Sequence, residues 1–257
     1  MHEPEDIKAA VRERYGAWAQ SGASCCPAPA GGASCSCGGS SEALGYDPVE
    51  LAALPEGADL GLGCGNPLGF AALEPGQTVL DLGSGAGIDC LLAAKRVGPT
   101  GHVIGVDMTP EMVEKARENA ARGGFDTVEF REGTIEALPV DDESVDAVIS
   151  NCVINLVPDK ATAFREIFRV LKPGGRLEVS DIVLVGELPD GMEDDVESYV
   201  ECLSGAVQKW EYMMYLRNAG YAWAGIQSET PYGEEGSPFA SIHVSALKGD
   251  CAPGGSC

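Results

Sequence analysis

Residues 78–87, TVLDLGSGAG, decide the fold of this chain. Residues 78–82 have the apolar character of a short buried strand, and the glycines after them predict a tight turn at its carboxyl end. The residues after the turn, up to about 97, predict a helix. A strand, a glycine-rich turn and a helix in this order let the backbone approach a ligand, as in nucleotide-type sites.

Strands and helices keep alternating beyond this stretch. We expect strands at 102–107, 127–131, 145–150 and 176–181, and helices at 109–122 and 159–171. Thr109 can cap the first of these helices, and Pro110 suits its first position. Repeated βα units predict an α/β fold, a doubly wound Rossmann-like parallel sheet with helices on both faces.

The two ends of the chain carry different patterns. Residues 5–19 predict an amphipathic helix, whereas residues 21–41 are rich in Gly, Ser, Ala and Pro and predict a flexible segment. Further elements are expected near the C-terminus: a helical stripe of Met192, Val196, Tyr199, Val200 and Leu203, a helix at 208–219, and strands at 225–229 and 239–247. These elements predict a small α+β cap or a completion of the sheet.

The charge excludes several classes of partner. The chain has 257 residues, 17 Lys+Arg and 40 Asp+Glu, and a formal net charge of −23. This acidity argues against a nucleic-acid partner and against an anionic membrane surface. No apolar run is long enough to span a membrane, and the acidic N-terminus is unlike a secretory signal. We therefore expect a cytoplasmic protein that binds neither nucleic acid nor membrane.

Ten cysteines are unusual in such a chain. In a reducing compartment they indicate metal binding or thiol chemistry, not a disulfide scaffold, and the absence of a CxxC pair disfavours zinc ribbons and thioredoxin-like sites. They fall into three groups: Cys25, Cys26, Cys35 and Cys37 in the flexible segment, Cys64, Cys90, Cys152 and Cys202 in the body, and Cys251 and Cys257 in the tail. Cys90, inside the first helix of the sheet region, is expected only to pack.

Asp107 ends the second expected strand. A carboxylate at that place can accept hydrogen bonds from both ribose hydroxyls of a nucleoside. The glycine turn is neither the GxGxxG of dinucleotide enzymes nor the GxxxxGK[ST] of a P-loop, so another nucleoside cofactor is favoured.

Together, DLGSGAG, VIGVD, SNCV at the end of the fourth strand and LKPGG before the fifth resemble the class I S-adenosylmethionine-dependent methyltransferases, over about residues 76–182. The resemblance implies S-adenosylmethionine as cofactor. It assigns the cofactor contacts to Gly83, Ser84, Gly85 and Gly87 for the methionine end, Asp107 for the ribose, Met108, Ile135 and Glu136 around the adenine, and Asn151. A nicotinamide enzyme of similar architecture is the alternative, and the glycine turn and PGG both favour methyl transfer.

A longer set of phrases is more specific. GLGCGNP, DLGSGAGIDC, GVDMTPEM, SNCVINLVPDK, RVLKPGGRL, SD and ECLSGA together resemble the arsenite S-adenosylmethionine methyltransferases, over about residues 60–206. The resemblance implies that Cys64, Cys152 and Cys202 bind trivalent arsenic. A fourth, upstream cysteine is implied as well; Cys26 is favoured and Cys35 is close behind, with Cys25 and Cys37 left open. Thr134 departs from the family, in which many members carry an acidic residue there.

The chemistry suits these residues because trivalent arsenic is soft and prefers thiolate sulfur. The substrates implied are arsenite and methylarsenite, methylated for detoxification. The resemblance also implies that Cys64 and an upstream cysteine form a disulfide during turnover, which thioredoxin or glutathione then reduces. Cys251 and Cys257 could deliver arsenic to the site or be inert.

Two other functions remain open at this point: methylation of a small organic substrate, which leaves the cysteines unused, and metalloid binding without turnover, which leaves the glycine turn unused.

The sequence also predicts the organisation of the chain. We expect an N-terminal helix with a Cys-rich segment (1–45), a methyltransferase domain (46–185), a cap beside the arsenic site (186–248) and a Cys-containing tail (249–257).

Overall fold

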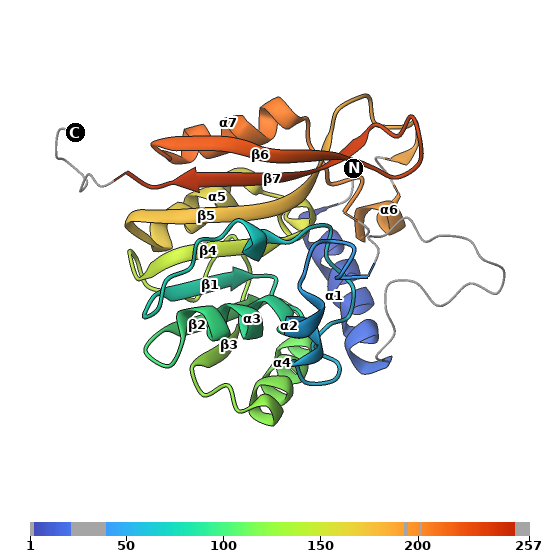
Figure 1. The fold of residues 1–257 in the computed structure, drawn as a ribbon. Helices are drawn as coiled ribbons and strands as arrows, with labels where there is room; N and C mark the ends of the chain where they lie inside the picture. The colour runs from blue at the N-terminus through green and yellow to red at the C-terminus, as the bar shows by residue number, and fades with distance from the viewer. Residues whose placement is uncertain (1–2, 22–39, 193–194, 201, 250–257) are drawn as a thin grey trace.

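One seven-stranded sheet organises the part of the chain that a computed structural model describes, residues 3–21, 40–192, 195–200 and 202–249. The strand order is β3-β2-β1-β4-β5-β7-β6 (Figure 1). The strands are β1 (Thr78–Leu82), β2 (His102–Asp107), β3 (Val128–Glu132), β4 (Val145–Asn151), β5 (Leu171–Leu184), β6 (Trp223–Tyr232) and β7 (Phe239–Leu247). β1 to β5 are parallel, and β7 and β6 complete the sheet as antiparallel neighbours. The predicted doubly wound α/β fold is confirmed.

Helices cover both faces of this sheet because the strand residues alternate in direction. Val79 and Ile149 pack with α3 (Ile88–Val97) and α4 (Pro110–Gly123) on one face. Leu80 and Val148 pack with α5 (Lys160–Val170) and α7 (Lys209–Ala219) on the other. The sheet is therefore buried on both sides, which explains why apolar side chains point to both faces of its central strands.

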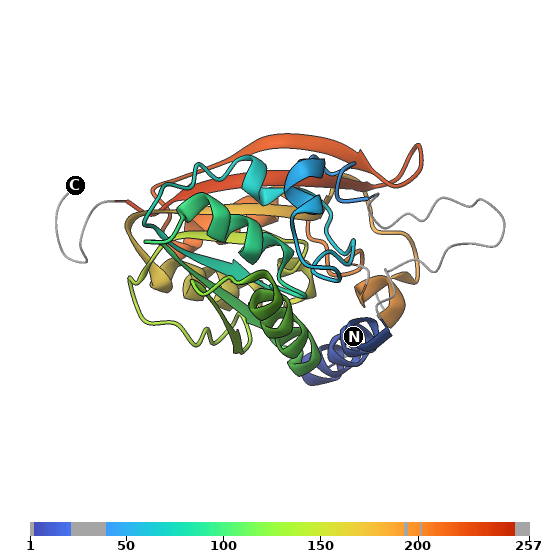
Figure 2. The ribbon, with the colours of Figure 1, turned by 60° about the horizontal axis from the view of Figure 1, so that its bottom comes forward.

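The long helix α1 and several short elements lie against this core. α1 (Pro4–Ser21) lies beside α4 and α6 (Val196–Val200), as Figures 1 and 2 show from two directions. The other short elements are α2 (Pro48–Ala52) and the 3₁₀ turns η1 (Pro67–Gly69) and η2 (Ile154–Leu156). No helix of the described residues is long and apolar enough to cross a membrane.

Three elements differ clearly in extent from the sequence prediction. β6 spans Trp223–Tyr232 and not only 225–229, because β7 pairs with it from Trp223 to Tyr232. β5 is longer than 176–181 because a bulge around Gly174, whose φ is 75°, lets Leu171 pair with Val145, and because β7 pairs with it as far as Leu184. The helical stripe expected from Met192 to Leu203 is helical only in α6, and both of those end residues lie outside it. The left-handed backbone of Cys202, φ 67°, is incompatible with a continuing helix.

The packing of α5 on the sheet gives a direct test of the core. Phe164 is fully buried and meets Tyr212 of α7 edge to face at 5.2 Å between ring centroids. Phe164→Ala should lower the free energy of unfolding by about 3–5 kcal/mol, because it removes the packing and leaves a cavity. Denaturant unfolding followed by circular dichroism measures it. Val49→Ala, at a side chain that is 78% exposed, is the matched control and should change little. Equal effects of the two would contradict this account of the core.

Candidate functional site

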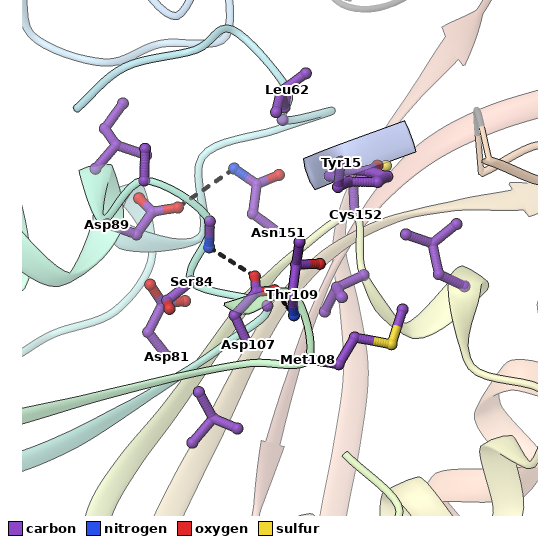
Figure 3. Close-up of a pocket in the computed structure, with 18 of the residues that line it drawn as sticks. Tyr15, Leu62, Asp81, Ser84, Asp89, Asp107, Met108, Thr109, Asn151 and Cys152 are labelled. Carbon is purple, nitrogen blue, oxygen red and sulfur yellow. Dashed lines mark hydrogen bonds between the residues drawn. The ribbon is translucent and has the colours of Figure 1, made fainter. Parts of the chain in front are cut away.

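A pocket opens at the carboxyl ends of β1, β2 and β4 (Figure 3). The sheet order reverses there, since β1 lies between β2 and β4, and ligands of such sheets bind at this switch point. The pocket is lined by most of the residues assigned to the cofactor from the sequence: Gly83, Ser84, Gly85, Asp107, Met108, Ile135, Glu136 and Asn151, together with Cys152.

The glycine turn after β1 gives the pocket a backbone wall. Gly83 and Gly85 have φ of 62° and 51°, which side chains rarely tolerate. A Cβ on Gly83 would lie 2.4 Å from Cγ2 of Val153, whereas a Cβ on Gly85 would meet nothing within 4 Å. The Ser84 hydroxyl is buried, lines the pocket and has no hydrogen-bond partner there. A buried hydroxyl of this kind is an available contact for a polar ligand.

Asp107 holds the turn in place from the end of β2. Its carboxylate accepts hydrogen bonds from the backbone N–H of Gly85 at 2.9 Å and of Thr109 at 2.9 Å. Burial raises the pKa of Asp107 above its usual range, while these hydrogen bonds act in the opposite direction. Each oxygen keeps a further lone pair, so a ribose hydroxyl can still donate to it.

Helix α1 covers the pocket from the outside. Lys8, Val11 and Tyr15 of α1 line it, and Lys8 forms an ion pair with Glu136 at 3.0 Å. In Figure 3, Tyr15 lies on the same side as Cys152, away from Asp89. The helix therefore shields the part of the pocket nearest to Cys152 from water.

Asn151 connects the pocket to the loop that carries Cys64. Its Oδ1 accepts a hydrogen bond from the backbone N–H of Cys64 at 3.1 Å. Its Nδ2 donates to the Tyr46 hydroxyl at 3.0 Å, to the Gly65 carbonyl at 2.9 Å and, at 3.4 Å, to Asp89. Tyr46 in turn donates to Asp89 at 2.8 Å. Burial raises the pKa of Asp89 to about 6, although the hydrogen bonds that it accepts from Tyr46 and Asn151 lower it.

The loop itself lies very close to the sheet. A Cβ on Gly63 would be 2.6 Å from Nδ2 of Asn151, and a Cβ on Gly65 would be 2.6 Å from Cβ of Ser180. The two glycines of GLGCG therefore let Cys64 approach β4 and β5. The Ser241 hydroxyl fixes the loop from β7 by donating to the Cys64 carbonyl at 2.9 Å.

Three buried thiols meet beside the pocket. Cys64, Cys152 and Cys202 are 4%, 7% and 4% exposed and are not in disulfides. The Cys202 thiol donates to the Cys152 carbonyl at 2.9 Å, and the Cys64 thiol contacts the Ser180 carbonyl at 3.7 Å. Cys152 and Cys202 both have left-handed backbones, with φ of 58° and 67°. Of the three, only Cys152 also lines the pocket.

The surroundings favour the protonated thiols. Burial raises the pKa of Cys64. The contact with Cys152 and burial raise the pKa of Cys202 well above its usual value. For Cys152 the contact with Cys202 lowers the pKa, but the contact with Cys64, burial and the charge of Asp181 outweigh it, and the net shift is strongly upward.

Two buried ionisable side chains, Asp181 and Lys160, lie near the thiols. Asp181 accepts hydrogen bonds from the Ile182 N–H at 3.0 Å and from the Tyr212 hydroxyl at 3.2 Å, and burial raises its pKa to about 7. Lys160 donates to the carbonyls of Asn155 and Val157, and burial lowers its pKa to about 8.

Comparisons with known proteins agree on the kind of protein. Residues 73–220 match a family model described as "Methyltransferase domain". The chain is 52% identical over 227 residues to an arsenite methyltransferase of Halobacterium salinarum, covering 85% of this chain and 58% of that protein. It is 41% identical over 202 residues to an arsenite methyltransferase of Aquipseudomonas alcaligenes, covering 76% and 58%.

A solved structure gives the same result. It is an arsenic(III) S-adenosylmethionine methyltransferase from Chlamydomonas reinhardtii, with a TM-score of 0.66 and 35% identity, over 81% of this chain and 73% of that one. The chain belongs to the arsenite methyltransferase family. It spans 58% of the length of the two relatives from Halobacterium and Aquipseudomonas.

Class I methyltransferases use S-adenosylmethionine, and the pocket fits this cofactor. The unpartnered Ser84 hydroxyl and the open side of Gly85 suit its polar methionine end, and the free lone pairs of Asp107 suit its ribose.

Not every residue assigned from the sequence lies at the site. Gly87 does not line the pocket; it precedes α3 with φ 99°, and a Cβ there would be 3.1 Å from the Phe130 ring. Cys26, with Cys25, Cys35, Cys37, Cys251 and Cys257, lies outside the described residues. Sequence reasoning missed the roles of Tyr46, Asp89 and Asp181. Asp181 had a signal because it ends the strand predicted at 176–181, and Asp89 had one because it lies in the phrase DLGSGAGIDC; Tyr46 had none.

The hydrogen bonds of Asp107 predict its effect on the cofactor. Asp107→Ala should weaken S-adenosylmethionine binding by about tenfold or more, because it removes a buried charged acceptor worth ~1.5–3 kcal/mol. Isothermal titration calorimetry measures the dissociation constant. Asp126→Ala, at an exposed position outside the pocket, should leave it unchanged. An unchanged constant for Asp107→Ala removes this residue from the ribose contact.

The hydrogen bonds of Asn151 predict its effect on the Cys64 loop. Asn151→Ala should raise the alkylation rate of the Cys64 thiol by about tenfold, because the loop loses buried hydrogen bonds worth ~1–3 kcal/mol and opens more often. Mass spectrometry of each cysteine peptide gives the rates. Cys90, fully buried in α3, is the internal control and should react as before. If both thiols gain reactivity equally, the substitution has loosened the whole fold instead.

Proposed function

We propose that this protein transfers methyl groups from S-adenosylmethionine to trivalent arsenic held by Cys64, Cys152 and Cys202. The observation that carries the proposal is the position of Cys152, which lines the cofactor pocket and also contacts the other two thiols. Three thiolates complete the pyramidal coordination of trivalent arsenic and leave it one lone pair. The relatives named as arsenite methyltransferases support the same substrate.

The raised pKa values of the thiols are compatible with arsenic binding. Arsenite in neutral water is the trihydroxide. Each thiol that forms a sulfur–arsenic bond gives its proton to a departing hydroxide, which leaves as water. Three thiols and one arsenic trihydroxide thus give a neutral complex and three waters, so no charge is left in the buried site.

Bound S-adenosylmethionine supplies a methyl group on a positively charged sulfur. The glycine turn and Asp107 would hold the cofactor and Cys152 would hold the arsenic at the adjoining wall, so that the arsenic lone pair could attack the methyl carbon as the carbon–sulfur bond breaks. Catalysis then depends on proximity and orientation. No general base is required because the nucleophile carries no proton. Tyr15 of α1 lies on the same side of the pocket as Cys152 and would limit the access of water there.

Methylation raises arsenic formally from trivalent to pentavalent, and a complete cycle must return two electrons to it. We propose that Cys64 and an upstream cysteine, Cys26 in preference to Cys35, Cys25 or Cys37, supply them by forming a disulfide. Thioredoxin or glutathione would then reduce this disulfide. Arsenite and methylarsenite are the proposed substrates, and the reducing cytoplasm is the proposed location.

One incubation tests the proposal. Purified protein is mixed with arsenite, S-adenosylmethionine and a thiol reductant, and the arsenic species and S-adenosylhomocysteine are followed over time by mass spectrometry. Methylated arsenic and S-adenosylhomocysteine should rise together. Arsenite binding without either product would favour a metalloid-binding protein, and transfer only to an organic acceptor would favour a small-molecule methyltransferase.

The thiol cluster predicts which cysteines matter. Cys152→Ser or Cys202→Ser should lower arsenite methylation at least about a hundredfold, because a hydroxyl is a hard ligand that soft arsenic binds poorly. S-adenosylmethionine affinity should survive in both variants. Cys90→Ser, which alters a buried thiol away from the cluster, serves as the matched control and should retain activity. Full activity in both cluster variants would refute the thiolate site.

A further inference from the structure

The thiol cluster contains a second possible set of ligands, which shares Cys64 and Cys152 with the proposed arsenic site and has Asp181 in place of Cys202. The Sγ atoms of Cys64 and Cys152 and a carboxylate oxygen of Asp181 all lie within 4.8 Å of one another. All three side chains are buried. Asp181 reaches this position from the end of β5, whereas Cys202 approaches Cys152 from beyond α6.

This set differs in chemistry from three thiols. Trivalent arsenic takes sulfur, whereas a thiophilic divalent cation such as zinc or cadmium also accepts a carboxylate beside thiolates. Asp181 is already oriented for such a role, since the Ile182 N–H and the Tyr212 hydroxyl each hold its carboxylate. Fixed outer partners of this kind are typical of carboxylate ligands.

The charges around the cluster also match a divalent ion. Two thiolates and the Asp181 carboxylate carry three negative charges, and a divalent cation together with the buried Lys160 ammonium carries three positive ones. The positive charge of Lys160 lowers the pKa of Asp181, and the negative charge of Asp181 raises the pKa of Lys160, although burial outweighs both effects. With three thiolates in place of two, the buried site would keep an uncompensated negative charge, which is unfavourable. The neutral arrangement leaves Cys202 as a thiol.

We propose that Cys64, Cys152 and Asp181 form a binding site for thiophilic divalent cations of the zinc and cadmium class. A cation bound there would exclude arsenic, because it occupies Cys64 and Cys152, two of the three proposed arsenic ligands. Binding breaks two S–H bonds, releases two protons to water and changes no oxidation state. The exclusion of arsenic rests on the proposed function; the cation site itself does not. Arsenic and the divalent ion thus share Cys64 and Cys152 and differ in their third ligand, Cys202 or Asp181.

The test uses the full chain, reduced, with serine at the six cysteines outside the described residues, so that only cysteines of the body remain. Cadmium is titrated while the ultraviolet absorbance of cadmium–thiolate bonds is recorded, and arsenite binding is measured separately by equilibrium dialysis. Asp181→Asn should weaken cadmium binding at least about tenfold and leave arsenite binding unchanged. Cys202→Ser should weaken arsenite binding at least about tenfold and leave cadmium binding unchanged. Cys90→Ser is the control for both ligands.

The outcomes separate the two proposals. Equal cadmium affinity in Asp181→Asn and the parent chain overturns the cation site, whether or not arsenite is methylated. Cadmium binding that depends on Asp181, together with failure of the unsubstituted chain with all ten cysteines to methylate arsenite, leaves the cation site standing and removes the proposed function. Circular dichroism and S-adenosylmethionine binding show whether Asp181→Asn is folded. If it is not, Asp181→Glu, which keeps the charge and moves the oxygen, should still shift the cadmium affinity and not the arsenite affinity; no shift there overturns the cation site.

Discussion

Leu82 of β1 and Ser150 of β4 are paired neighbours in a parallel sheet, and both halves of the site follow from that register. The glycine turn begins one residue after Leu82, and Asn151 and Cys152 come directly after Ser150. Parallel pairing thus places the glycine turn of the pocket and the Cys152 thiol at the same edge of the sheet, each directly after its strand. Cys64 and Cys202 come from outside these strands, and their positions depend on contacts with that edge.

Buried polar side chains supply those contacts. Asn151 uses both ends of its amide to hold the Cys64 loop, and Asn155 donates to the Cys202 carbonyl at 3.2 Å and to the Ile182 carbonyl at 2.7 Å. Leaving such groups unpaired would cost about 1–3 kcal/mol each. The arrangement is therefore specific for the donors: moving either cysteine would remove an acceptor from the Nδ2 of Asn151 or Asn155, while the Asn155 Oδ1 has no hydrogen-bond partner among the described residues.

Local signals in the sequence predicted the parts of the fold that depend on neighbours in the chain. The apolar run at 78–82, the glycine turn and Pro110 fixed β1, the pocket wall and the start of α4. The partnership of Tyr46, Asp89 and Asn151 was beyond reach, because the first and last are 105 positions apart and meet only through tertiary packing. The short extent of α6 was missed because the apolar stripe continues to Leu203, and nothing in the stripe marks Cys202 as a residue with a left-handed backbone.

The left-handed backbones of Cys152 and Cys202 set stability against chemistry. A residue with a side chain is strained in that conformation, by about 1 kcal/mol or more, and glycine is not. Replacing either cysteine by glycine would relieve the strain and remove the thiol together. The backbone at these two positions therefore favours glycine, and the two thiols are present at the expense of conformational stability.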